Sequence, residues 1–140
     1  HVSIYSWKKM LAAIEEGEFA ETDAYGVPVI DFDTALEAQV ELGLGPLHTQ
    51  FDGQGNAYTS LFLETVVAKW SVKDLKVLDK LPTHYNIGHL VAAEGDTIKP
   101  DGRFLIAMNK WALDRFGDVK DGDVIETYVM QELAPELTRV

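Results

Sequence analysis

The sequence predicts an all-β fold: a fragment of a β-propeller that holds about two blades and parts of their neighbours, with a short helix near the N-terminus. One observation behind this prediction is a series of short runs rich in β-branched and aromatic residues, bounded by turn residues. The other is an internal near-repeat, in which residues 47–62 and 88–109 both contain a histidine-bearing strand, an Asp-Gly turn and an apolar strand. Short strands that recur at a fixed period are typical of propeller blades.

The spacing of the near-repeat fits one blade. His48 and His89 lie 41 residues apart, and the Asp-Gly pairs at 52–53 and 101–102 lie 49 residues apart. Propeller blades recur every ~40 to 50 residues. We therefore expect two consecutive four-stranded antiparallel units, with each Asp-Gly pair in a hairpin turn.

The N-terminal region is predicted to contain strands and one helix. Residues 1–6 alternate like a strand, and Ser6 can cap the helix that follows. The helix is predicted by four apolar residues at helical spacing: Trp7, Met10, Leu11 and Ile14. The run EEGEF ends it, and residues 27–32 and 37–42 are further strand candidates.

The strongest strand signal lies between residues 47 and 72, where three runs predict a meander of three antiparallel strands. Residues 73–81, with the sequence KDLKVLDKL, predict a helical turn. Later strand candidates are 84–96, 104–111 and 124–130. We expect residues 117–140 to pack less well than residues 42–112.

Composition excludes several classes of function. Twelve Lys and Arg against 23 Asp and Glu give a net charge of −11, which repels a nucleic-acid backbone. The absence of cysteine excludes disulfides, thiolate metal sites and cysteine nucleophiles. No apolar run approaches the roughly 20 residues of a membrane helix, and no signal-peptide pattern opens the chain. Because the chain begins with His1 within a strand pattern, we expect a piece of a longer protein.

Motifs for hydrolysis and nucleotide binding are missing, so neither activity is supported. Three acidic pairs can contact a hard cation: Asp31 with Asp33, Glu94 with Asp96, and Asp121 with Asp123. None has the spacing of a calcium loop, and acidic turns of this kind are usually solvated.

Histidine is the residue type most suggestive of chemistry here. If His48 and His89 occupy corresponding strands of adjacent blades, both face the central channel, where imidazoles suit a transition metal such as copper. His84 and His89 are five apart, which places them on opposite faces of a regular strand unless Gly88 marks a bulge. Two histidines are too few for a closed site, so other ligands must come from elsewhere. The alternative is that each histidine is an ordinary polar residue at a strand end.

Three blocks carry a resemblance to a known family: GLGPLHTQFDGQGNAYTSLFLETVVAKW, HYNIGHLVAAEGDT and DGRFLIAMNKWALDRF. Together, from about Leu42 to Phe116, they resemble the propeller domain of nitrous-oxide reductases. The resemblance implies a seven-bladed propeller with a sulfide-bridged four-copper cluster on histidines. It also implies a separate cupredoxin domain with a dinuclear copper site for electron transfer.

The resemblance also implies roles for single residues. His48 of GPLHT and His89 after the glycine match copper ligands, whereas His84 matches a nearby histidine that binds no copper. Lys110 of NKW matches a lysine beside the cluster, whose positive charge would stabilise bound substrate electrostatically. The same position contributes to a calcium site, through its main-chain carbonyl, because a lysine side chain has no acceptor. After Phe116 the pattern is lost, and Glu126 stands out of register with the family's calcium glutamate.

The implied function is reduction of nitrous oxide to dinitrogen and water in denitrification. The chain, residues 1–140, would be a partial propeller domain without the cupredoxin domain, and inactive alone. The resemblance further implies a periplasmic head-to-tail homodimer and an electron donor such as a cytochrome c or a cupredoxin. The alternative is a propeller-type binding or scaffold module that has lost the metal.

Overall fold

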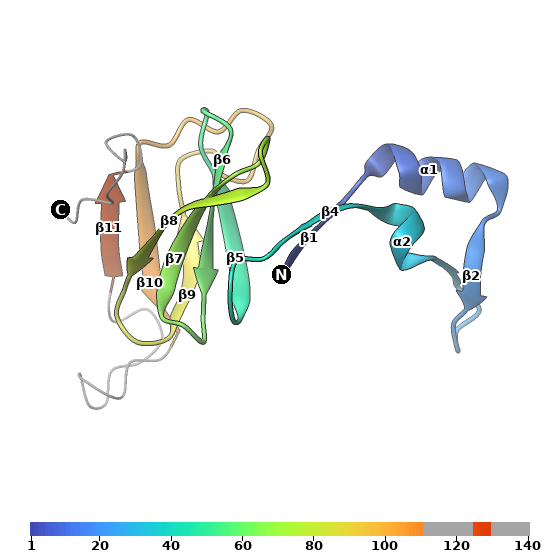
Figure 1. The fold of residues 1–140 in the computed structure, drawn as a ribbon, viewed down its shortest axis with the longest axis horizontal. Coiled ribbons are helices and arrows are strands. Elements are labelled where there is room, and N and C mark those ends of the chain that lie inside the picture. Colours follow the sequence, from blue (N-terminus) through green and yellow to red (C-terminus); the bar gives the residue numbers. More distant parts are fainter. Residues whose placement is uncertain (111–124, 130–140) are drawn as a thin grey trace. The chain divides into compact units, whose positions relative to one another are not determined.

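The structure is a computed structural model that describes residues 1–110 and, as backbone only, the strand Ile125–Val129. The chain divides into two compact units. One comprises Val2–Val40, and the other comprises His1 with the chain from Glu41 onward. Figure 1 shows the elements of each unit.

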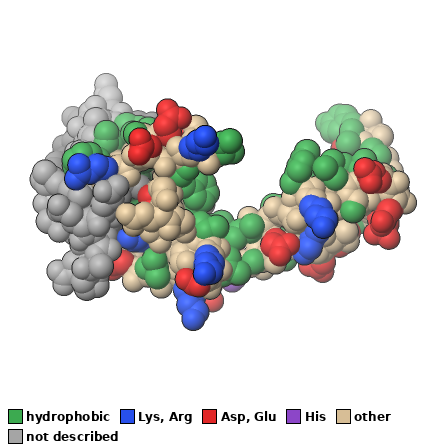
Figure 2. Space-filling model, turned by 90° about the horizontal axis from the view of Figure 1, so that it is seen from above, with side chains coloured by type: hydrophobic (Ala, Val, Ile, Leu, Met, Phe, Trp, Pro, Cys, Tyr) green, Lys and Arg blue, Asp and Glu red, His purple; other side chains and the backbone are tan. Residues whose placement is uncertain are grey.

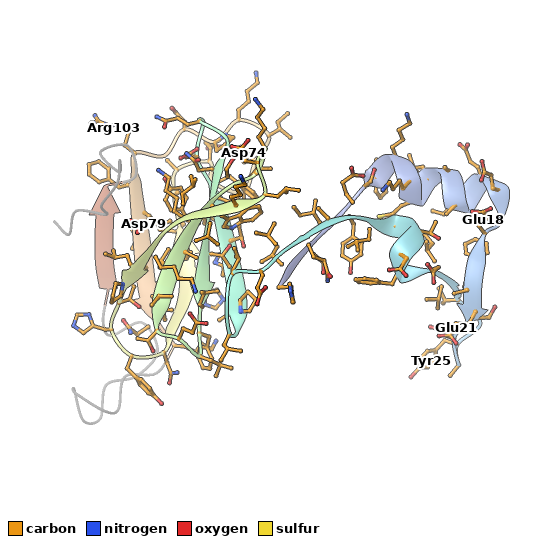
Figure 3. All side chains as sticks on the ribbon, in the orientation of Figure 1. Glu18, Glu21, Tyr25, Asp74, Asp79 and Arg103 are labelled. Carbon is orange, nitrogen blue, oxygen red and sulfur yellow. The ribbon has the colours of Figure 1, made fainter. Side chains whose placement is uncertain are left out.

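The unit Val2–Val40 combines two small antiparallel sheets with two helices. Strand β1 (Val2–Tyr5) pairs with β4 (Leu36–Val40), and β2 (Phe19–Thr22) forms a hairpin with β3 (Pro28–Ile30). The helices are α1 (Trp7–Glu16) and α2 (Phe32–Ala35). In Figure 3, Tyr25 lies at the tip of the β2–β3 hairpin, and its side chain is 91% exposed.

Helix α1 begins and ends where the sequence predicts. The Ser6 side chain accepts a hydrogen bond from the Lys9 N–H, and Gly17 closes the helix in the left-handed conformation at φ 69°. Three of the four apolar residues that predicted the helix are exposed: Trp7, Leu11 and Ile14. The buried residue of the helix is Ala13. The strand β2 was not predicted.

The second unit begins with a four-stranded antiparallel sheet. Its strands are β5 (Pro46–Phe51), β6 (Asn56–Leu61), β7 (Val66–Ser71) and β8 (Lys76–Pro82). They pair in chain order, each with the next (Figure 1). This sheet is the first of the two predicted units, and its strand number agrees with that prediction.

The prediction of a helical turn at residues 73–81 was wrong, whereas β5, β6 and β7 form the predicted meander of three antiparallel strands. A turn at residues 72–75 leads directly into β8, which pairs with β7 along its length. Leu75, Leu78 and Leu81 are spaced like a helix face, but Leu75 has φ 56°, which reverses the chain instead. In Figure 3, Asp74 lies at this turn between β7 and β8. Pairing with β7 decided the conformation, against the local pattern.

The predicted turn at Asp52–Gly53 joins β5 and β6, and a buried carboxylate organises it. Asp52 is 4% exposed. Its Oδ1 accepts hydrogen bonds from the N–H groups of Gln54 and Asn56, at 2.8 and 2.9 Å. Its Oδ2 accepts from the Asn56 amide at 2.9 Å and from the Tyr58 hydroxyl at 3.0 Å. These bonds fix both the turn and the first residues of β6.

The second sheet is also antiparallel. Strand β10 (Phe104–Asn109) lies between β9 (Ile87–Val91) and β11 (Ile125–Val129). The connection from β9 to β10 spans residues 92–103, and Asp101–Gly102 lie near its end rather than at a tight hairpin. The predicted looser packing of residues 117–140 falls outside the described residues, except that the backbone of β11 pairs with β10.

The two sheets share one core. Apolar residues of β6 and β7 gather with residues of the second sheet and of the segment just after β9: Tyr58, Val67, Ile87, Leu90, Ala92, Leu105 and Ala107. Leu81 of β8 packs against this group. Burial of this group between the two sheets holds them together.

Charged side chains are scattered over the surface. On the face that Figure 2 presents, lysine and arginine side chains lie singly among acidic and apolar ones. In the described part of the chain, neither helix has the length and apolar character that a bilayer crossing requires.

Tyr58 provides a test of the core. Burial, the Asp52 charge and the hydrogen bond to it raise the pKa of the Tyr58 hydroxyl above its ordinary value. Tyr58→Phe removes a buried bond to a carboxylate, so we expect the free energy of unfolding at pH 7 to fall by about 2 kcal/mol. An unfolded tyrosine has a pKa of about 10, whereas folded Tyr58 is still neutral at that pH. The wild type therefore loses this stabilisation as pH rises above about 10, and the difference from Tyr58→Phe shrinks.

Chemical denaturation at pH 7 and at pH 10.5 measures both effects. Tyr85→Phe is the control, because Tyr85 is 43% exposed in the same unit. An unchanged stability of Tyr58→Phe at pH 7 would contradict the prediction.

Candidate metal centre at the inner strands

Two histidines occupy equivalent positions in the two sheets. In the pairing of β5 with β6, Pro46 faces Leu61 and Thr49 faces Thr59, so Leu47 and His48 together oppose the single residue Ser60. Two residues against one is a β-bulge. His48 is the second residue of that bulge.

The same irregularity occurs in the second sheet. Ile87 faces Asn109 and Leu90 faces Ala107, so Gly88 and His89 together oppose the single residue Met108. A bulge at Gly88, one of the possibilities left open by the sequence, is present in the structure. His89, like His48, is the second residue of a bulge in the first strand of its sheet.

The two bulges bring the imidazoles together. The ring centroids of His48 and His89 lie 5.4 Å apart, with the ring planes at 68° to one another. His48 is partly buried and His89 is exposed. A bulge changes the direction of the side chain that it carries, and bulges are frequent beside active sites. The proximity predicted from the repeat is present, whereas the role of these residues as copper ligands stays a prediction.

The His48 ring is held by the neighbouring sheet. Its Nδ1 accepts a hydrogen bond of 2.9 Å from the backbone N–H of Leu90 in β9. Burial, followed by the proximity of His89, lowers the pKa of His48, while Asp96 acts in the opposite direction. The neutral ring is therefore favoured, which is the form that binds metals.

Gln50 makes a second bridge of the same kind two residues along β5. Its side-chain Oε1 accepts a hydrogen bond of 3.1 Å from the Ala92 N–H. Beside it, the Phe51 N–H donates to the Gly95 carbonyl at 2.7 Å. Side chains of β5 thus satisfy backbone donors along the edge of β9. Neither Gln50 nor this contact was predicted, because a single glutamine carries no sequence signal for it.

The two imidazoles fit part of a copper site. They are of the ligand type that copper prefers, they converge, and His48 is kept neutral. Because Nδ1 accepts a hydrogen bond from the Leu90 N–H, the neutral His48 ring carries its proton on Nε2. A metal would bind either at Nδ1, in place of that hydrogen bond, or at Nε2, once its proton has moved to Nδ1. Among the described residues, no group of three or more His, Cys, Asp or Glu could hold a metal ion. A complete site would need further ligands.

The remaining candidate residues lie outside the histidine pair. Lys110 follows β10, and its N–H donates to the Asn86 carbonyl at 2.7 Å. A Cβ on Gly88 would lie 3.1 Å from the Lys110 Cβ, a close contact that favours glycine in the bulge before His89. His84 lies in the connection between β8 and β9 and is not a member of the ring pair.

The acidic pairs have no metal-like arrangement in the described residues. Asp31 caps α2, where its Oδ2 accepts from the Thr34 N–H at 3.0 Å. Asp121, Asp123 and the side chain of Glu126 lie outside the described residues.

Residues 80–122 match the family model for the nitrous oxide reductase propeller repeat. That stretch contains His89, its bulge and β10. Over 95 residues, 60% of its length, the chain is 48% identical to a nitrous-oxide reductase of Ralstonia nicotianae. These matches support a fragment of a nitrous-oxide reductase.

Two further nitrous-oxide reductases give similar matches to this segment. It is 45% identical over 95 residues to the enzyme of Cupriavidus necator, and 39% identical over 104 residues to that of Stutzerimonas stutzeri. These alignments cover 60% and 67% of the segment, but 15% and 16% of the relatives. The segment therefore spans about 15% of the length of the reductases that it matches. With the antiparallel sheets, the repeat match confirms the predicted all-β propeller fragment.

Gly95 tests the bridge between the two blades of the reductase segment. A Cβ at this position would clash with Gln50 Oε1. We expect Gly95→Ala to displace that oxygen and to break its hydrogen bond with the Ala92 N–H. Hydrogen exchange at Ala92 would then be about tenfold faster, for a loss of about 1.4 kcal/mol, close to one hydrogen bond.

The matched control is Gly55→Ala, because a Cβ at Gly55 meets no atom within 4 Å, although its φ of 84° adds local strain. That variant is expected to leave exchange at Ala92 unchanged. If Gly95→Ala left the Ala92 amide as protected as in the wild type, the bridge would not hold β9.

Proposed function

We propose that this chain is part of the copper-cluster propeller of a nitrous-oxide reductase, and that His48 and His89 are two of the cluster's ligands. The observation that supports this most directly is the pair of imidazoles 5.4 Å apart, carried by equivalent bulges in successive blades. A propeller that had only a scaffold role would have no need for two such bulges.

The reaction of the whole enzyme would be the two-electron, two-proton reduction of nitrous oxide to dinitrogen and water. A bound copper cluster would supply the electrons and a binding place for the gas. The contribution of this chain would be to hold two neutral imidazoles at a fixed separation. In the metal-free protein the Leu90 N–H orients the His48 ring, and burial lowers its pKa, which favours the neutral ring. Copper at either ring nitrogen would take the place of this hydrogen bond.

Lys110 would act on the substrate by its charge. It lines a pocket of about 310 Å³ together with apolar side chains and the backbone around the start of β5: Gly45, Pro46, Leu47, Phe62 and Leu63. Leu47 is the first residue of the His48 bulge, and Lys110 lies beside the His89 bulge. An ammonium group in a mainly apolar pocket stabilises negative charge more strongly than it does in water. Its main-chain carbonyl would contribute to a calcium site.

The other components would belong to the rest of the protein. They are the remaining histidine ligands, a cupredoxin domain with a dinuclear copper site, and the partner subunit of a head-to-tail homodimer. We place the enzyme in the periplasm, with a cytochrome c or a cupredoxin as electron donor. Residues 1–140 would then be a partial propeller domain that is inactive alone.

The ligand assignment is tested in the full-length reductase that contains this segment. His48→Ala and His89→Ala are each expected to lower copper content and to abolish nitrous-oxide reduction, because each removes an imidazole donor. Copper per subunit and turnover with a reduced artificial donor are the measurements.

His84→Ala is the control, since it removes a histidine outside the ring pair. It is expected to retain most copper and activity. Full copper loading and turnover in both the His48 and the His89 variants would refute the assignment.

Lys110→Met separates charge from metal binding. The substitution keeps the length of the side chain and removes its ammonium group. We therefore expect normal copper content, with turnover lowered by about 100-fold because one electrostatic stabiliser is lost. Lys99→Met, in an exposed connection, is the control. Unchanged turnover in Lys110→Met would exclude a role for its charge.

A further inference from the structure

The bulge in β5 interrupts the regular backbone ladder beside His48. In an antiparallel ladder, every second pair of facing residues exchanges backbone hydrogen bonds, and a bulge interrupts this pattern. The interruption lies between Pro46 and Thr49. Buried backbone groups need other partners at such a point.

Ser60 supplies those partners. Its hydroxyl accepts a hydrogen bond of 3.2 Å from the His48 N–H and donates to the His48 carbonyl at 3.4 Å. A hydroxyl can do both, since it is one donor and an acceptor. Ser60 is 0% exposed, so water cannot replace its side chain.

The strand is fixed immediately beyond the bulge. Thr49 and Thr59 face each other, with their hydroxyl oxygens 2.9 Å apart, and the Trp70 indole N–H donates to Thr59 Oγ1 at 2.9 Å. These contacts set the register of β5 on one side of His48. Ser60 contacts the backbone of His48 itself.

The second bulge has no such residue. Met108 faces His89, and its side chain offers no comparable donor. His89 is exposed, whereas His48 is partly buried. A buried hydroxyl opposite the bulge is therefore a particular feature of the first blade.

We propose that Ser60 is a positioning residue for His48, whose hydroxyl holds the backbone of the bulge so that the imidazole faces His89. The effect on copper rests on the proposed function, because it requires His48 to be a ligand. The effect on the ring contact does not depend on copper.

The copper test compares Ser60→Ala with Ser71→Ala in the full-length reductase. Ser71 is a matched control: it is a buried serine in β7, and its hydroxyl also makes two hydrogen bonds, both with Asp74. We expect the Cu(I) chelator concentration that removes half of the copper to fall about 10- to 100-fold in Ser60→Ala. Ser71→Ala is expected to match the wild type, and Ser60→Thr, which keeps a hydroxyl, is expected to restore retention.

The ring contact is tested in crystals of the metal-free protein. The wild type and Ser71→Ala are expected to keep the His48–His89 contact, and Ser60→Ala is expected to lose it. A retained contact in Ser60→Ala would overturn the proposal. If His48→Ala kept its copper, the proposed function would fail, and this crystal comparison would still decide the role of Ser60.

A measurement on the wild type serves if Ser60→Ala does not fold. The His48 amide is expected to exchange with solvent at least tenfold more slowly than an unprotected amide, because Ser60 accepts its hydrogen. Exchange at the unprotected rate would overturn the proposal.

Discussion

Much of the second unit depends on how the backbone N–H groups at the free edge of β9 find hydrogen-bond acceptors. β9 pairs with β10 on one side, and the other side presents the backbone N–H groups of Leu90 and of Ala92, which directly follows β9. A sheet edge with unpaired donors is costly if it is buried. Here the side chains of His48 and Gln50 accept those hydrogens. The same two residues thereby connect successive blades, so the contact between blades and the position of His48 have one physical cause.

The two bulges explain how a regular sheet can present a histidine to a neighbouring blade. Along a regular strand, side chains alternate between the two faces. One added residue before His48 and one before His89 interrupt that alternation at equivalent points. In the second blade the added residue is Gly88, where a side chain would press against Lys110 and Met108. In the first blade the added residue is Leu47, which is 52% exposed. There the opposing strand contributes Ser60, whose hydroxyl accepts a hydrogen bond from the His48 N–H.

Features carried by short local patterns could be predicted from the sequence. The Ser6 cap, the end of α1 at Gly17 and the turn at Asp52 each depend on neighbouring residues, and each was found. The proximity of His48 and His89 followed from the repeat. In contrast, β8 was missed because pairing with β7 determined its conformation. Ser60 and Gln50 were missed because their partners are brought close only by the fold.

The composition of β8 has a consequence for self-association. β8 is the outermost strand of its sheet, so its far edge has no neighbour in that sheet. An uncovered strand edge can recruit the edge of another molecule, and charged side chains and proline discourage such pairing. β8 contains Lys76, Asp79 and Lys80 and ends at Pro82. The Lys80 Nζ forms a salt bridge of 3.0 Å with Glu64 Oε2. The composition of β8 thus disfavours edge-to-edge polymerisation along this side of the sheet.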